Sequence, residues 1–178
     1  APPGVDDPWL HLVMDLCGDE DAPARTDTPG SMTPLVQRVA FLKREVQLFS
    51  GLGGSELLPV AEILRERRYE PGAALFREGD PPDGVYIIAE GEVELRRGGE
   101  ALSRLGRGAA FGEVAAFDAQ PRTATAAAVT VVRGYTLAGK DLYKLAQRHP
   151  SIGLQVVWWM ARIVREVTTR EASLRAAL

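Results

Sequence analysis

The sequence predicts an α+β protein in which helices flank a small antiparallel barrel or jelly roll. Nine glycines fall between residues 72 and 112, and the short stretches between them are apolar or alternate between apolar and polar residues. Many short strands with glycine turns and no intervening helical pattern are typical of this architecture. Apolar residues recur at helical spacing on both sides of this region. The expected order of elements is therefore helices, barrel, helices.

Charge and composition divide the chain into four segments. The first thirty residues carry seven acidic side chains and one arginine, whereas the whole chain has a net charge of -3. This part is also rich in proline and glycine, so residues 1–32 are expected to form a flexible acidic leader or linker. Residues 33–69 are expected to form N-terminal helices, residues 70–138 the barrel, and residues 139–178 C-terminal helices. Residues 33–178 together would make one domain with a hydrophobic core.

The N-terminal helices are predicted from capping residues and apolar spacing. Thr33 followed by Pro34 is typical of a helix N-cap and the first helical residue. Apolar residues then recur at helical spacing as far as Phe49. Glycines break this helix, and Ser55 is expected to cap a second helix that runs to the neighbourhood of Arg68.

Several stretches of the middle segment have the composition expected of strands. They are short, apolar or alternating, and separated by turn residues. The expected strands include residues 74–76, 85–88, 93–95, 123–132 and 135–138.

Helical patterns return at the end of the chain. Asp141 is expected to cap a helix that ends at Arg148, because Pro150 would stop it. Ser151 then begins a long helix that is expected to reach the neighbourhood of Ala176.

Composition excludes several classes of protein. Cys17 is the only cysteine and the chain has two histidines, which excludes a disulfide scaffold, a zinc ribbon and an iron–sulfur protein. Residues 70–138 contain no histidine, so a metal-dependent enzyme built on a jelly roll is excluded as well. His11, His149 and Cys17 are too scattered for a nucleophilic triad. No enzymatic activity is therefore expected.

The sequence favours a protein of the cytoplasm or of the cytosolic face of a membrane protein. The longest apolar stretch, residues 152–164, contains Gln155 and Arg162. It falls short of the roughly 20 residues that a membrane-spanning helix needs, and no signal peptide begins the chain. The acidic net charge argues against polyanion binding. We expect neither membrane contact nor nucleic-acid binding by this chain.

Residues 111–125 stand apart from ordinary barrel sequence. Gly112 allows the backbone to approach another group closely, and the residues after it favour a short helix whose free N–H groups would attract an anion. Pro121 keeps the preceding backbone extended, so Arg122 would project from the start of a strand into the barrel. An arginine there needs a partner because an unpaired buried charge is very unfavourable. A phosphate fits this need, since the planar guanidinium binds it through two hydrogen bonds.

Glu113 lies nine residues before Arg122 and has a different expected role. A phosphate would repel its carboxylate, so Glu113 is expected to accept a hydrogen bond from a hydroxyl group such as that of a ribose. The alternative is that Glu113 and Arg122 are solvated, or that they pair with each other. The concentration of glycine, acid, proline, arginine and threonine in one segment favours a ligand site.

This segment resembles the phosphate-binding cassette of the cyclic nucleotide-binding domain family. The family includes regulatory subunits of cyclic-AMP-dependent protein kinase, catabolite-activator-type regulators and nucleotide-gated channels. The matching motifs are Phe111-Gly112-Glu113-Val114-Ala115 and Pro121-Arg122-Thr123-Ala124-Thr125. Residues 76–80 and 85–93 resemble the family's early strands and turn, and the whole resemblance covers residues 40–170. It implies an antiparallel β-roll, a jelly-roll-like double-stranded β-helix, that C-terminal lid helices close.

The resemblance also implies a ligand and its contacts. Glu113 would take the ribose 2′-hydroxyl and Arg122 the cyclic phosphate, with backbone amides of residues 112–115 and Thr123 around the sugar and phosphate. Cyclic AMP is favoured over cyclic GMP, although Thr123 does not decide the base. No metal or other cofactor is implied. The expected ligand-binding residues are Phe111, Gly112, Glu113, Val114, Ala115, Arg122, Thr123 and Ala124.

The last helix carries the expected lid residues. The family closes its pocket with this helix, so Trp158 or Trp159 would stack on the purine, with Arg162 beside them. The alternatives are that the tryptophans pack in the core or in a dimer, and that Arg162 belongs to a solvated face. The helix would pair with a second copy through its apolar positions, which are Ile152, Val156, Trp159, Ile163 and Val167.

These expectations lead to one functional hypothesis and one alternative. The domain would bind a cyclic nucleotide, close its C-terminal helices over it, and so control an attached or partner protein. The absence of an initial methionine and the linker-like first thirty residues suggest further domains of a larger parent protein. No room for a DNA-binding helix-turn-helix is expected after the long helix. The alternative is a structural or interaction domain of the same fold that binds no nucleotide.

Overall fold

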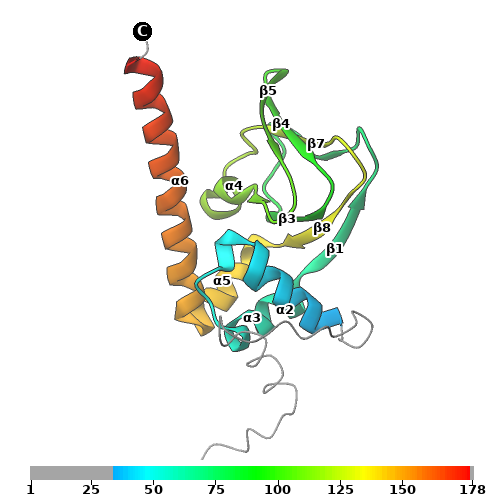
Figure 1. The fold of residues 1–178 in the computed structure, drawn as a ribbon, viewed down its shortest axis with the longest axis vertical. Coiled ribbons are helices and arrows are strands. Elements are labelled where there is room, and N and C mark those ends of the chain that lie inside the picture. The colour runs from blue at the N-terminus through cyan, green and yellow to red at the C-terminus, as the bar shows by residue number, and fades with distance from the viewer. Residues whose placement is uncertain (1–33, 177–178) are drawn as a thin grey trace, which may run out of the picture.

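Figure 1 shows the computed structural model of the chain, which describes residues 34–176. Helices precede the roll, a short helix lies within it, and two helices follow it. The described residues therefore confirm the expected order of helices, roll and helices. The expected leader, residues 1–32, and the expected N-cap at Thr33 lie outside the described residues.

The first helix is shorter than the sequence predicts. α2 (Pro34–Glu45) buries an apolar face whose members are spaced by three residues, as expected for an amphipathic helix. It ends before Val46, and the residues that were expected to continue it form the separate 3-10 helix η1 (Gln47–Phe49). The predicted helix to Phe49 is thus two elements.

The prediction for the second helix was wrong at both ends. α3 (Gly54–Ile63) has Gly53, not Ser55, as its N-cap residue. The backbone N–H of Gly53 donates to the carboxylate of Glu56 at 2.7 Å, which satisfies one of the free donors at the helix start. The helix ends at Ile63 instead of continuing to Arg68.

The residues after α3 form the first strand of the roll. β1 (Arg65–Tyr69) pairs antiparallel with β8 (Val132–Leu137), with Arg65 opposite Thr136 and Tyr69 opposite Val132. The sequence Arg-Glu-Arg-Arg has a helix-favouring composition, but cross-strand pairing overrides local propensity. The roll therefore begins inside the segment that was expected to be helical.

Within residues 34–176 the roll consists of two four-stranded antiparallel sheets. Their strand orders are β1-β8-β3-β6 and β2-β7-β4-β5, so most neighbouring strands are distant in sequence. The remaining strands are β2 (Ala74–Phe76), β3 (Val85–Glu90), β4 (Val93–Arg97), β5 (Glu100–Leu105), β6 (Ala110–Phe111) and β7 (Thr125–Ala128). The single strand expected over residues 123–132 is instead β7 and the start of β8, because the chain bends between them to change sheets.

Two apolar clusters hold the domain together. Alternate residues of a strand point to opposite faces, so Ile87 of β3 packs against the helices while Tyr86 and Ile88 point into the roll. The inner cluster also contains Phe76 and Phe111. The outer cluster joins the first sheet to α2, α3 and the C-terminal helices, which gather at one side of the roll in Figure 1.

The C-terminal helices begin slightly earlier than predicted. α5 (Gly139–Arg148) has Asp141 in its first turn rather than at its N-cap. α6 (Pro150–Ala176) begins at Pro150, which is tolerated there because a first helical residue needs no N–H partner. Figure 1 shows α6 running alongside the roll, with its far end beyond the strands. No helix of the described residues is long and apolar enough to cross a membrane.

Candidate ligand-binding site

The motif residues Gly112 and Glu113 form the start of a short helix. α4 (Glu113–Asp118) follows Gly112, whose φ of 79° lies in the left-handed region that glycine adopts without strain. This turn directs the carbonyl group of Gly112 toward the side chain of Arg122, whose Nη1 donates to it at 2.6 Å. The two halves of the motif are therefore in direct contact.

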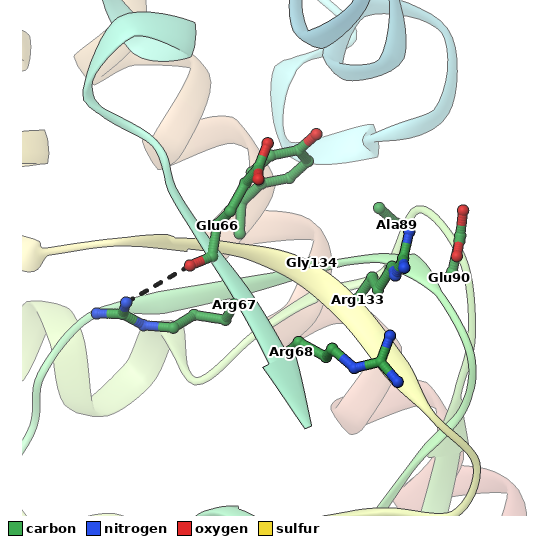
Figure 2. Close-up of a pocket in the computed structure, with 8 residues that line it drawn as sticks. Glu66, Arg67, Arg68, Ala89, Glu90, Arg133 and Gly134 are labelled. Atoms are coloured by element: carbon green, nitrogen blue, oxygen red, sulfur yellow. Dashed lines mark hydrogen bonds between the residues drawn. The ribbon is translucent and has the colours of Figure 1, made fainter. Parts of the chain in front are cut away.

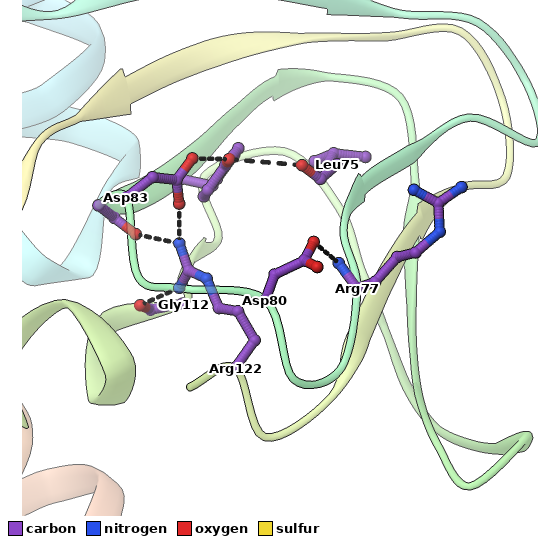
Figure 3. Close-up of polar contacts among 8 residues, drawn as sticks. Leu75, Arg77, Asp80, Asp83, Gly112 and Arg122 are labelled. Atoms are coloured by element: carbon purple, nitrogen blue, oxygen red, sulfur yellow. Dashed lines mark hydrogen bonds and ion pairs between the residues drawn. The ribbon is translucent and has the colours of Figure 1, made fainter. Parts of the chain in front are cut away.

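Arg122 is buried, with 3% of its surface exposed. Protein groups already surround its guanidinium, as Figure 3 shows. Nη2 donates to the carbonyl oxygen of Gly84 at 2.8 Å and forms an ion pair with Asp83. The guanidinium carbon lies 4.1 Å from the ring centre of Phe76, within cation–π distance. The side chain is thus fixed by a carboxylate, two carbonyl groups and an aromatic ring.

Within residues 34–176, one N–H group of this guanidinium has no hydrogen-bond partner. Nε of Arg122 is buried and makes no hydrogen bond with any described residue. A buried donor without an acceptor is unfavourable and uncommon in folded proteins. An anionic oxygen beside Nε would satisfy it, because charge-assisted hydrogen bonds to guanidinium groups are the strong ones.

Asp83 is held in turn by Tyr86. The hydroxyl group of Tyr86 donates to the second carboxylate oxygen of Asp83 at 2.5 Å. Burial, followed by the hydrogen bond and charge of Asp83, raises the pKa of Tyr86 far above its usual value, so the hydroxyl stays protonated and remains a donor. The side chain of Asp83 is 59% exposed. Its carboxylate therefore links the buried Arg122 to the solvent.

An aromatic cluster supports Arg122 from inside the roll. The ring of Tyr86 lies 5.3 Å from that of Phe76 and 5.6 Å from that of Phe111, measured between centroids. These separations are typical of packed aromatic pairs. Phe111, an expected ligand-binding residue, is buried in this cluster. Its observed contribution is to the packing beneath the guanidinium.

Glu113 and Arg122 do not form the mutual pair that the sequence left open. Among the described residues the carboxylate partner of Arg122 is Asp83, which sequence reasoning missed. Glu113 is partly buried rather than solvated. Burial raises the pKa of its carboxyl group above the usual value, although a backbone N–H group and the charge of Arg122 act in the opposite direction.

The other motif residues lie around these two. Ala115 is buried and Ala124 is partly buried, whereas Thr123 is exposed. Val114 lies in the first turn of α4, but its side chain is outside the described part of the structure. Among the expected cassette residues, the structure therefore shows direct contact between Gly112 and Arg122.

The expected lid residues are not gathered with them. Trp159 is 8% exposed and belongs to the helical core, as one alternative predicted, while Trp158 is 69% exposed. Arg162 donates through Nη2 to the side chain of Gln47 in η1 at 3.2 Å. Neither tryptophan lies in the aromatic cluster around Arg122.

A hollow lies elsewhere, on the outer face of the first sheet. Its volume is about 520 Å³, and arginine, glutamate and tyrosine side chains of β1, β3 and β8 line it, as Figure 2 shows. None of the expected cassette residues lines it. This hollow is therefore distinct from the expected site around Arg122. Within the described residues no group of three or more histidine, cysteine or acidic side chains is arranged to hold a metal ion.

Comparison with known proteins agrees with the fold and the motif. The family model of the cyclic nucleotide-binding domain matches residues 66–149. The chain is 41% identical over 103 residues to a cAMP-dependent protein kinase regulatory subunit of Yarrowia lipolytica, which covers 57% of this chain and 27% of that protein. It is 36% identical over 107 residues to a cyclic nucleotide-gated potassium channel of Mesorhizobium japonicum, with coverage of 60% and 30%.

A solved structure gives the same result. The catabolite activator protein of Thermus thermophilus matches with a TM-score of 0.66 and 31% sequence identity, covering 72% of this chain and 63% of that one. The chain thus spans less than a third of the kinase subunit and of the channel that it matches. It belongs to the cyclic nucleotide-binding domain family.

Proposed function

We propose that this domain binds a cyclic nucleotide, cyclic AMP in preference to cyclic GMP, with the cyclic phosphate on Arg122. The observation that carries the proposal is the buried Nε of Arg122, which no described residue accepts from. A phosphate oxygen beside Nε would complete the hydrogen bonding of the guanidinium. The preference for cyclic AMP is supported by the kinase regulatory subunit named above, which is named for that nucleotide.

Asp83 neutralises Arg122 until the ligand arrives. The ion pair keeps a buried guanidinium from being left without a counter-charge. A phosphate bound to both Nε and Nη2 of Arg122 would compete with the carboxylate of Asp83, which already pairs with Nη2. Because the side chain of Asp83 is largely exposed, it can turn toward the solvent when the phosphate takes its place.

Glu113 binds the ribose in this proposal. Its position at the first residue of α4 places it next to Gly112, which itself contacts Arg122. A partly buried carboxylate that lacks an arginine partner can accept a hydrogen bond from the 2′-hydroxyl group.

The proposal assigns the response to the ligand to the C-terminal helices. Gly139, the first residue of α5, lies so close to α4 that a Cβ atom on it would be 2.7 Å from the carbonyl oxygen of Ala116. A shift of α4 on ligand binding therefore reaches α5 and, through it, α6. Closure of these helices over the nucleotide, and control of an attached or partner protein, complete the proposed function.

The exposed face of α6 provides a surface for a second copy. Of the five positions that the sequence predicts for this surface, Ile152, Val156 and Trp159 are instead buried in the domain's own core. An apolar stripe that shares only Val167 with the predicted positions is exposed, at spacings of three, four and seven residues that suit a helix pair. It consists of Leu154, Val157, Trp158, Val164 and Val167. Pairing of two domains through this stripe is the proposed oligomeric arrangement.

The alternative function is a domain that binds no nucleotide. It is favoured by the occupation of Arg122, since Asp83, Gly84 and Gly112 already accept from both of its terminal nitrogens. In that case the guanidinium would be a structural bridge between the start of β3 and the start of α4.

Calorimetric titration of the wild-type chain separates the two functions. The chain is titrated with cyclic AMP, cyclic GMP and, as a control, 5′-AMP, which lacks the cyclic ester. The proposal predicts saturable binding of cyclic AMP, weaker binding of cyclic GMP and the weakest binding of 5′-AMP. Absence of cyclic nucleotide binding at about 1 mM would contradict the proposal and favour the structural alternative.

A further inference from the structure

The segment that carries Arg122 is hydrogen-bonded along both of its edges. On one edge it meets the turn between β2 and β3: the backbone N–H of Arg122 donates to the carbonyl oxygen of Asp80 at 2.8 Å, and the N–H of Gly79 donates to the carbonyl oxygen of Arg122 at 2.8 Å. The N–H of Arg77 donates to the side chain of Asp80 at 2.8 Å, which closes that turn, as Figure 3 shows.

On the other edge the segment meets the end of β4. Nε of Arg97, the last residue of β4, donates to the carbonyl oxygen of Thr123 at 2.9 Å. Arg97 is exposed and comes from the hairpin of β4 and β5. One arginine side chain thus joins the hairpin to the residue directly after Arg122.

Glu78 connects the two edges. Its backbone N–H donates to Oγ1 of Thr125 at 2.9 Å, and its carboxylate accepts from the backbone N–H of Gly98 at 3.0 Å. Gly98 follows Arg97 in the chain. The contacts therefore form a closed ring that runs from Thr125 through Glu78 and Gly98 to Arg97 and back to Thr123.

This ring surrounds the residues whose orientation the binding site needs. Arg122 is buried while the next residue, Thr123, is exposed, so the two side chains point to different sides of the segment. A slip or rotation of the segment would turn the guanidinium out of the roll. Each hydrogen bond of the ring is exposed and individually weak, but together they fix one backbone from two sides.

We infer that Glu78 and Arg97 are positioning residues of the nucleotide site, which act through the backbone of residues 122–125 and not through contact with the ligand. The effect on binding rests on the proposed function, whereas the effect on the backbone does not. Cyclic AMP affinity therefore tests the first effect, and amide exchange in the ligand-free protein tests the second.

The first test measures cyclic AMP affinity by calorimetry. Arg97→Ala and Glu78→Ala each remove one bond of the ring and are expected to weaken binding about two- to tenfold. Arg97→Lys keeps a donor and Glu78→Gln keeps an acceptor, so both should restore most of the affinity. The control is Arg133→Ala, an exposed arginine of β8 on the outer hollow, which should bind as the wild type does.

The second test measures amide hydrogen exchange in the ligand-free proteins. In Arg97→Ala and Glu78→Ala the amides of Arg122 and Gly79 should exchange faster than in the wild type, while amides between β3 and β8 keep their rates. The inference would be overturned if the amides of Arg122 and Gly79 exchanged at the wild-type rate in both alanine variants. It would also be overturned if the wild type bound cyclic AMP and the alanine variants bound it equally tightly. Conservative variants that bind as weakly as the alanine variants would overturn it as well. If the wild type binds no nucleotide but exchange is still faster in the alanine variants, the positioning of the backbone by the ring is supported and only the proposed function is contradicted.

Discussion

The side chain of Arg122 packs directly against Gly112 and leaves no room for a larger residue at position 112. A Cβ atom on Gly112 would lie 2.6 Å from Nη1 of Arg122, and the same Nη1 donates to the carbonyl oxygen of Gly112. Carbon and nitrogen atoms that are not bonded do not approach so closely. The glycine of the motif thus supplies both the acceptor for the arginine and the space that the arginine fills.

Gly112→Ala is expected to harm both stability and binding. Its backbone has φ of 79°, and Gly72 provides a matched control because its φ of 84° is similar but a Cβ atom there would meet nothing within 4 Å. Gly72→Ala should lower stability only by the backbone strain, about 1–2 kcal/mol. Gly112→Ala should lower it further and weaken cyclic AMP binding at least tenfold, measured by urea denaturation and calorimetry. Equal effects of the two substitutions would contradict the close contact with Arg122.

Asp83→Asn is expected to destabilise the ligand-free domain. It removes the carboxylate that pairs with the buried guanidinium, and a hydrogen bond to a charged group contributes about 1.5–3 kcal/mol. Tyr86→Phe removes only the hydroxyl group that holds Asp83 and should lower stability by about 0.5–1.5 kcal/mol. Glu90→Gln, an exposed change in the outer hollow, is the control in the same denaturation series. If both variants match the control, the ion pair does not stabilise the empty site.

Glu113→Gln should raise stability at neutral pH while weakening ligand binding. Because burial raises the folded-state pKa of Glu113 above 4.5, the folded protein holds this proton more tightly than the unfolded chain does. The contribution of Glu113 to stability therefore falls as pH rises from 4.5 through the raised pKa, and it stays low above that pKa.

Glutamine does not ionise, so the stability of Glu113→Gln should depend less on pH than that of the wild type between pH 4.5 and the raised pKa of Glu113. Its cyclic AMP affinity should nevertheless fall about tenfold or more, since a charged acceptor for the ribose is lost. Denaturation at a series of pH values and calorimetry measure the two effects, with Glu62→Gln, an exposed change, as the control. Unchanged affinity would contradict the ribose assignment.

Trp158 and Trp159 should behave differently despite being neighbours. Trp159→Ala opens a cavity in the helical core and is expected to lower stability by about 3–5 kcal/mol. Trp158→Ala changes an exposed residue and should lie within about 0.5 kcal/mol of the wild type. Sedimentation equilibrium of Trp158→Ala also tests the proposed helix pair, since loss of this side chain should shift a dimer toward monomer. An unaltered dimer would contradict pairing through the exposed stripe.

The cassette could be predicted from sequence because its informative residues are close together in the chain. Gly112, Glu113 and Arg122 lie within one short segment, and the geometry of each residue follows from its neighbours. The partners of Arg122 could not be predicted in this way. Asp83 is 39 residues away from it in the chain, and the two regions meet through tertiary contacts, which include the backbone N–H of Arg122 donating to the carbonyl oxygen of Asp80. The local signals for this region were the apolar run that begins at Val85 and the resemblance of residues 76–80 to the family's early turn.

Helix limits and helix faces were also set by tertiary structure. The helix expected to reach Arg68 ends at Ile63 because β8 takes residues 65–69 as a strand partner. In α6 the periodicity predicts an apolar face, but it does not predict that Ile152 and Val156 are buried in the domain's own core. Propensity and spacing are local, whereas burial depends on which other elements arrive.

Calorimetry with cyclic AMP on Arg122→Ala tests most directly whether Arg122 is the phosphate contact. Circular dichroism and thermal unfolding first establish that the variant is folded, and Arg133→Ala serves as the matched arginine control. Loss of a buried charged contact is expected to weaken binding about 30-fold or more, while the control binds as the wild type does. Arg122→Lys keeps the charge without the planar fork and should fall between them. A folded Arg122→Ala variant that binds cyclic AMP as tightly as the wild type would contradict the account.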